Sequence, residues 1–247
     1  MTQVQVRFLG SGDAFGSGGR LQTCFLLEGE NAPVLIDCGA SSLVAMKREG
    51  IDSSEIRWIV LSHLHGDHHF GGIPFLILDG QFSRRTQPLT IVGPPGVRTR
   101  VQAAMEVFFP SSSKVQQRFS VEFIELEERV AIAVGPATVT PFLVQHACGA
   151  PPYALRVEYG NKVIAYSGDT EWSESLVEVA RGADLFICEA YFFEKRIKYH
   201  LDYQTLRAHR DELKCKWLIL THMSEDMLNR TSEVEEDRAE DRLTLVL

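Results

Sequence analysis

The stretch SHLHGDHH, residues 62–69, contains four of the eight histidines of the chain together with an aspartate. It directly follows the apolar run IRWIVL (56–61), which is typical of a buried strand. His63 and His65 are two residues apart, so extended backbone directs both to one face, and Gly66 permits a turn before Asp67 and His68. Such a loop can offer two ligands to one metal ion and two to a second ion beside it.

Further ligand-type residues lie at or just beyond the ends of expected strands. His146 follows ATVTPFLVQ, Asp169 follows KVIAYSG, and His222 closes KWLILTH. Alone, each could be a capping or core residue, just as the loop alone could be a polar loop with surface histidines. Together they supply imidazoles and carboxylates that suit two zinc ions, with manganese or iron as alternatives. The predicted metal ligands are His63, His65, Asp67, His68, His146, Asp169 and His222.

The sequence pattern of the rest of the chain predicts many strands with helices between them. Apolar patterning predicts strands over 4–10, 23–29, 32–39, 56–62, 89–93, 184–190 and 216–222, with mostly β-structure from about 120 to 167. Helices are expected over 41–50, 96–108, 173–181 and 203–213. This order fits two packed sheets with helices outside. Nothing resembles a linker, so we expect a single domain over 1–247.

Composition limits the classes of partner. The formal net charge of −8 weighs against a general nucleic-acid surface, which relies on clustered Lys and Arg, but it allows an enzyme whose metals supply local positive charge. Five widely spaced cysteines with no CxxC pair indicate neither a disulfide framework nor a thiolate zinc site. No signal peptide or membrane-spanning run is visible, so we expect a cytoplasmic protein with no membrane partner.

The motif His63-x-His65-x-Asp67-His68, with the later ligands in matching order, resembles the metallo-β-lactamase superfamily over nearly the whole chain. The resemblance implies an αββα four-layer sandwich with the site at the sheet edges. It also implies a division of the ligands between two metal ions. By this resemblance one ion would be held by His63, His65 and His146 and the other by Asp67, His68 and His222, with Asp169 as the bridge between them.

Within that superfamily the chain most resembles the ribonuclease Z-like phosphodiesterases. The segments that carry this likeness are FLGSGDAFGSGGR (8–20), LIDCG (35–39) and CEAYF (188–192), the last followed by His200. Glu189 and His200 are similar to the glutamate and histidine that this family places near the leaving group.

Two departures from that family weigh against transfer RNA as the substrate. Leu201 and Asp202 stand where a serine and a threonine usually follow the histidine. The chain also lacks the long glycine- and proline-rich insertion that serves as the transfer-RNA arm of the family.

The sequence therefore predicts a metal-dependent hydrolase that uses a dimetal-bridged hydroxide on a small or cyclic phosphodiester or an RNA 3′ end. In this hypothesis Asp67 ligates a metal ion and orients the nucleophile, while His200, held by Glu189, protonates the departing alcohol. Two alternatives remain open: a thioester or lactone hydrolase of the same superfamily, and a non-catalytic metal-dependent binding protein. Dimers are common in the resembled family, so a homodimer is also an expectation.

Other features indicate no separate function. FLGSGDAFG is not a dinucleotide fingerprint, because its glycine spacing is wrong and more glycines follow where a helix should begin. His69 is expected to support a ligand or start a helix, and His209 to be exposed. The charge-rich segment SEVEEDRAEDR (232–242) is expected to be a solvated helix or tail.

Overall fold

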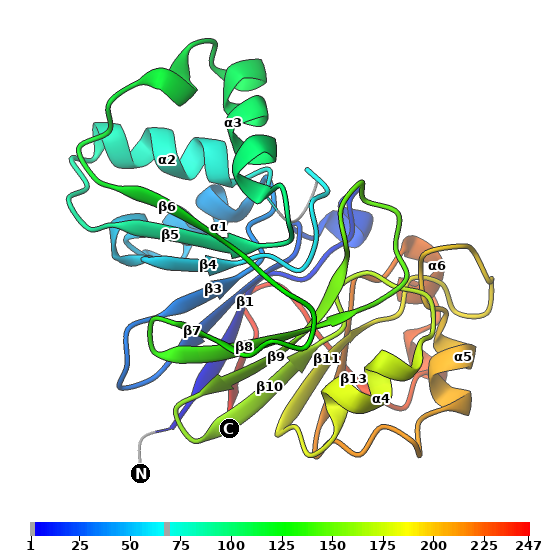
Figure 1. The fold of residues 1–247 in the computed structure, drawn as a ribbon. Coiled ribbons are helices and arrows are strands. Elements are labelled where there is room, and N and C mark those ends of the chain that lie inside the picture. The colour runs from blue at the N-terminus through cyan, green and yellow to red at the C-terminus, as the bar shows by residue number, and fades with distance from the viewer. Residues whose placement is uncertain (1–2, 67–69) are drawn as a thin grey trace.

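The computed structural model describes residues 3–66 and 70–247, and within them the strands form two sheets of seven (Figure 1). The first sheet has the order β14 (Thr244–Val246), β1 (Gln5–Gly10), β2 (Cys24–Glu28), β3 (Val34–Ile36), β4 (Trp58–Val60), β5 (Leu89–Gly93), β6 (Val121–Glu125). The second has the order β13 (Asp237–Arg238), β12 (Leu218–Thr221), β11 (Leu185–Glu189), β10 (Lys162–Tyr166), β9 (Tyr153–Tyr159), β8 (Ala137–Leu143), β7 (Ile132–Val134).

Helices flank the two sheets. Beside the first sheet lie α1 (Ser42–Arg48), α2 (Ile73–Phe82) and α3 (Val97–Phe108), and beside the second lie α4 (Glu174–Ala180), α5 (Tyr203–Ala208) and α6 (Glu225–Leu228) (Figure 1). Short 3₁₀ helices are η1 (Ser17–Gly19), η2 (Ser53–Glu55), η3 (Ser112–Lys114) and η4 (Thr231–Glu233).

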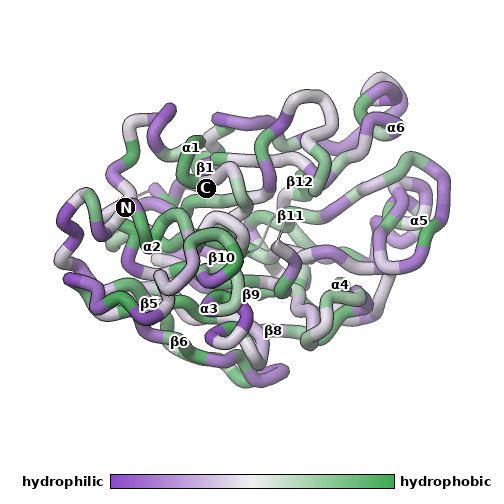
Figure 2. Tube along the Cα trace, turned by 90° about the horizontal axis from the view of Figure 1, so that it is seen from above, coloured by the Kyte–Doolittle hydropathy of each residue, from purple (hydrophilic) through white to green (hydrophobic). Residues whose placement is uncertain are grey.

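Three hydrophobic clusters of described residues correspond to the three spaces between four layers. Phe8 and Tyr166 belong to the cluster between the sheets, Met46 to the cluster under α1–α3, and Leu176 and Leu206 to the cluster under α4 and α5. In Figure 2 hydrophobic segments run along central strands such as β9 and β10, while hydrophilic segments gather around α5 and α6. The predicted αββα sandwich is confirmed.

The strand directions explain why the expected ligands meet. In the first sheet β3 to β6 are parallel, and β1 runs the same way because β2 is antiparallel to both β1 and β3. In the second sheet β10, β11 and β12 are parallel, and β8 shares their direction through antiparallel β9. The loops that follow these strands therefore lie at one edge of each sheet.

Hydrogen bonds join the two edges. The backbone N–H of His222 donates to Ser11 O at 3.2 Å, and that of Tyr153 donates to Ser62 O at 3.0 Å. Loops from opposite sheets are thus held beside each other at the end where the ligand residues lie.

The structure corrects part of the prediction for residues 232–242, which do not form a free tail. The segment overlaps η4, which has no buried residue, and contains β13, which pairs with β12. Ala239 is fully buried, and Asp241 accepts hydrogen bonds from Ser11 and Leu21. Asp241 thus makes polar contacts with loops of the first sheet, whereas Glu233, Glu235, Asp237, Glu240 and Arg242 remain exposed, so the segment is folded but partly solvated.

Periodicity also fails to predict α2 and β14. The helix α2, IPFLILDGQF, packs between the sheet and α3 and is apolar on almost every face. Its sequence therefore shows no amphipathic stripe by which a helix could be predicted. Among the described residues, no helix is long and apolar enough to cross a bilayer.

Candidate metal centre

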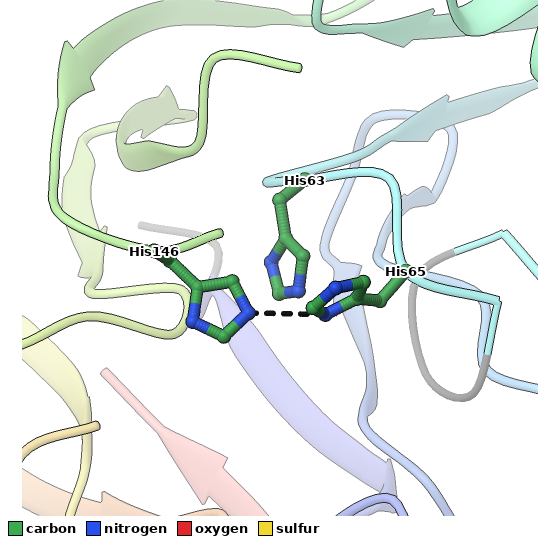
Figure 3. A group of neighbouring side chains, drawn as sticks. All are labelled: His63, His65 and His146. Carbon is green, nitrogen blue, oxygen red and sulfur yellow. Dashed lines mark hydrogen bonds between the residues drawn. The ribbon is translucent and has the colours of Figure 1, made fainter. Parts of the chain in front are cut away.

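Three histidines from two distant segments converge at the sheet edges (Figure 3). His63 and His65 come from the loop after β4, and His146 comes from the loop after β8. One ring nitrogen of each lies within 4.8 Å of the others, and His146 Nε2 is 3.0 Å from His65 Nδ1. His63 and His146 are buried, and the three rings together form a candidate group of nitrogen ligands.

The other nitrogens of two of these rings are held by backbone carbonyls. His146 Nδ1 lies 2.8 Å from the carbonyl oxygen of Tyr199, and His65 Nε2 lies 3.1 Å from that of Ala147. When each carbonyl accepts the ring N–H, the facing nitrogens both keep lone pairs directed at the centre. Burial lowers the pKa of His146, which favours its neutral, ligating form. Two lone pairs that face each other fit a shared cation.

His63 is supported by a serine and a buried aspartate. Ser62 Oγ lies 3.3 Å from His63 Nδ1 and donates to Asp37 Oδ2 at 3.0 Å, while Ser62 N donates to Asp37 Oδ1 at 2.9 Å. Asp37 is fully buried. Sequence reasoning did not single out either supporting residue, although Asp37 lies in the LIDCG segment and Ser62 opens the histidine stretch.

Asp169 lies between two groups of histidines. Its Oδ2 is 3.8 Å from His63 Nε2 and 3.9 Å from His146 Nε2, whereas its Oδ1 is 3.5 Å from His222 Nδ1. Each oxygen therefore faces a different imidazole group, as a bridging carboxylate requires. The predicted ligands Asp67 and His68, and the supporting residue His69, lie outside the described residues.

Residues in or beside the candidate site have backbone conformations with positive φ. His222 and Asp37 have φ of 55° and 56°, which is uncommon for residues with a Cβ. Gly168, next to Asp169, has φ of 59°, and a Cβ there would lie 2.8 Å from the carbonyl oxygen of Tyr153. Two residues with a Cβ thus adopt uncommon conformations just after strands β3 and β12, beside the candidate ligands.

Glu189 and His200 form a pair beside this cluster. His200 Nδ1 lies 3.0 Å from Glu189 Oε2, and the other oxygen of Glu189 accepts from the backbone N–H of Thr170. Glu189 is fully buried, and this burial raises its pKa to about 7, although His200 lowers it. The His200 ring stacks on His222 with centroids 5.4 Å apart, so the pair lies directly beside the ligand group.

A hollow of about 360 Å³ opens onto the cluster. Its lining residues are Ala14, Phe15, His65, Asp169, Tyr191, His200 and His222. The Tyr191 ring lies 4.8 Å from the His200 ring and 5.5 Å from the His222 ring. Three predicted ligands and His200 therefore face the same space, together with two aromatic residues that sequence reasoning did not assign.

The prediction that His209 is exposed holds only in part. Its ring stacks on Trp172 with centroids 4.0 Å apart, and its Nδ1 lies 2.7 Å from Glu212 Oε1, so the side chain is only 34% exposed. The charged neighbours in RAHRDE gave no sign of this contact, because Trp172 is distant in sequence.

Comparison with known proteins places the chain in a family. The family model described as "Anti-Pycsar protein Apyc1" matches residues 4–241. The chain belongs to this family. This Apyc1-family chain is also 28% identical to a Ribonuclease Z of Agathobacter rectalis, over 91% of the chain and 89% of that relative. The alignment spans 279 positions, more than the 247 residues of the chain, so segments of the relative have no counterpart here.

Solved structures give the same fold. The metallo-β-lactamase fold protein YhfI of Bacillus subtilis superposes with a TM-score of 0.80 at 20% identity, with all of both chains covered. The short form of human tRNase Z superposes with a TM-score of 0.77 at 25% identity, with 98% of both chains covered. The resemblance to ribonuclease Z-like metallo-β-lactamases is confirmed. Together with the histidine and aspartate cluster, these matches support a metal-dependent hydrolase for this Apyc1-family chain.

Proposed function

We propose that the chain is a phosphodiesterase that acts on a small or cyclic phosphodiester. The observation that carries this proposal is the Glu189–His200 pair, whose histidine lines the same hollow as His65, Asp169 and His222. An ester with a poor alcohol leaving group needs a positioned proton donor, whereas an acyl substrate with a good leaving group needs it less.

We assign His63, His65 and His146 to one metal ion, Asp67, His68 and His222 to a second, and Asp169 to both. The described members of this set fit the assignment: the three histidines offer nitrogens within 4.8 Å of one another, and the Asp169 oxygens face separate groups. Imidazole and carboxylate ligands suit zinc. When bound, such ions would offset charge on the phosphate oxygens and lower the pKa of a water molecule toward neutrality.

Side chains of the protein orient the nucleophile and protonate the leaving group. Asp67 would orient the attacking oxygen, and His65, Asp169 and His222 line the hollow in which the phosphate would lie. Glu189 accepts a hydrogen bond from His200 Nδ1, which fixes the ring and leaves Nε2 to donate a proton to the departing alkoxide. The backbone N–H of Thr170 holds Glu189 in turn, so the acid is oriented by a buried and fixed partner.

The size of the hollow favours a small substrate. At about 360 Å³ it lies near the lower end of the range for small-molecule sites. The segments of the ribonuclease Z relative that have no counterpart here also support a substrate that needs no RNA-binding arm.

Turnover of matched substrates tests the proposal. We expect the protein to hydrolyse bis(p-nitrophenyl) phosphate and a cyclic phosphodiester, and to leave a thioester and a lactone unchanged, in a side-by-side assay at known metal content. Acyl turnover alone would reject the proposal and support a thioester or lactone hydrolase. If the protein cleaved precursor transfer RNA but did not hydrolyse the small esters, an RNA 3′ end would instead be favoured as the substrate.

A further inference from the structure

Phe15 is a large aromatic side chain that the fold leaves in solvent, at 84% exposure, on the rim of the candidate active-site hollow. It lies in the loop after β1, at the sheet edge where the ligand residues gather. Single exposed apolar residues are common on protein surfaces, so exposure alone assigns no role. The position of Phe15 beside Asp169 and His222 and the way its loop is held are what distinguish it.

The Phe15 loop is fixed from inside. Asp13 is fully buried, and its Oδ1 accepts from the backbone N–H of Phe15 at 3.2 Å and of Ser17 at 2.9 Å. The Asp13 Oδ2 accepts from Ser17 Oγ at 2.7 Å. One buried carboxylate therefore sets the conformation of the turn that presents the Phe15 ring.

The base of the same loop is joined to the C-terminal part of the chain. Asp241 Oδ1 accepts from Ser11 N at 2.9 Å, and Asp241 Oδ2 accepts from Leu21 N at 2.8 Å. Gly18 also approaches α6 so closely that an added Cβ would lie 2.8 Å from Leu228 Cδ1. The ring of Phe15 is thus carried by a preorganised loop, which lowers the entropy cost of binding against it.

The chemistry of the hollow indicates what the ring contacts. Its histidine and aspartate lining residues are already assigned to metal ions or to the proton donor, which leaves Ala14, Phe15 and Tyr191. Phe15 and Ala14 come from the first half of the chain and Tyr191 from the second, so apolar surface borders the hollow from both halves. Apart from the histidines, Phe15 and Tyr191 are the aromatic residues among the described lining residues, so a planar ring attached to the phosphodiester would contact them.

We infer that Phe15 is a specificity residue that stacks on a planar ring of the substrate, such as a nucleobase, while the phosphate lies over Asp169 and His222. This inference rests on the proposed phosphodiesterase function. Stacking between an aromatic side chain and a base tolerates different bases, because every base has a π-face.

The test compares two esters that share the reacting group and differ in the ring. One is a nucleoside 3′,5′-cyclic phosphate, and the other is the matching 1-O-methyl riboside 3′,5′-cyclic phosphate, which lacks the base. For Phe15→Ala we expect KM for the nucleoside ester to rise about tenfold with kcat nearly constant, and KM for the abasic ester to change much less. Phe15→Trp should restore the low KM, whereas Phe15→Leu should not.

Phe82→Ala is the matched control, because Phe82 is 80% exposed at the end of α2 and does not line the hollow. Equal changes for both esters in Phe15→Ala, or no change in either, would overturn the inference while leaving the phosphodiesterase function intact. Parallel loss on both esters with an altered oligomeric state would make Phe15 an interface residue and would also overturn it. Failure of the wild-type protein to cleave either ester would reject the proposed function, and the inference would fall with it.

Discussion

His146→Ala is expected to remove bound metal and to lower phosphodiester turnover by at least about a thousandfold. The His146 ring is the proposed ligand that the second sheet brings to His63 and His65, and its Nε2 lies 3.0 Å from His65 Nδ1. Without it, one ion loses a ligand and the backbone carbonyl of Tyr199 loses its donor. Metal content per chain and initial rates on the same preparation measure both effects.

His209→Ala serves as the control, because His209 stacks on Trp172 and is not among the described lining residues of the hollow that holds His65 and Asp169. It should keep its metal. A His146→Ala protein that is folded by circular dichroism and retains both metal and turnover would contradict the ligand assignment.

His200→Ala is expected to lower kcat by about 10²–10⁴ on an ester with an alkyl alcohol leaving group, with metal content unchanged. The reason is the loss of the proton that His200 Nε2 supplies. The loss should be much smaller for bis(p-nitrophenyl) phosphate, because p-nitrophenolate departs without protonation. Rates on both esters, measured at saturating metal, give the comparison.

Glu189→Gln should show the same dependence on the leaving group with a smaller loss, since Glu189 acts by holding His200 Nδ1 at 3.0 Å. Equal losses on both esters would reject proton donation by His200. Loss of metal from His200→Ala would instead show that His200 is a ligand. Metal content must therefore be measured, because the donor atoms of His200, His146 and Asp169 lie within 4.8 Å of one another.

Much of the fold follows from local pattern. Apolar strands such as β4 and β5 are buried on both faces and read as short continuous runs, and the order of strands and helices specifies two covered sheets. The pattern fails where burial is not periodic, as in α2, and where charge hides tertiary pairing, as at Asp241 and β13. At Asp241 and β13 the deciding contacts are made with residues far away in sequence.

Some residues of the candidate site could likewise be predicted from the sequence and others could not. Ligand types and their places after strands are visible in sequence, so His63, His65, His146, Asp169 and His222 could be named in advance. The Asp37–Ser62 support of His63 could not, because no local signal joins residues 25 positions apart. The position of Phe15 could not be predicted from the sequence either, because only the folded loop places its ring at the hollow.

The most direct test of the central claim is phosphodiester turnover measured against bound metal in the wild-type protein, after chelation and stepwise return of zinc. We expect no turnover in the metal-free protein and a rise to full activity as bound metal approaches about two ions per chain. Turnover that persists in metal-free protein would contradict the account, as would full metal binding with no turnover of any phosphodiester.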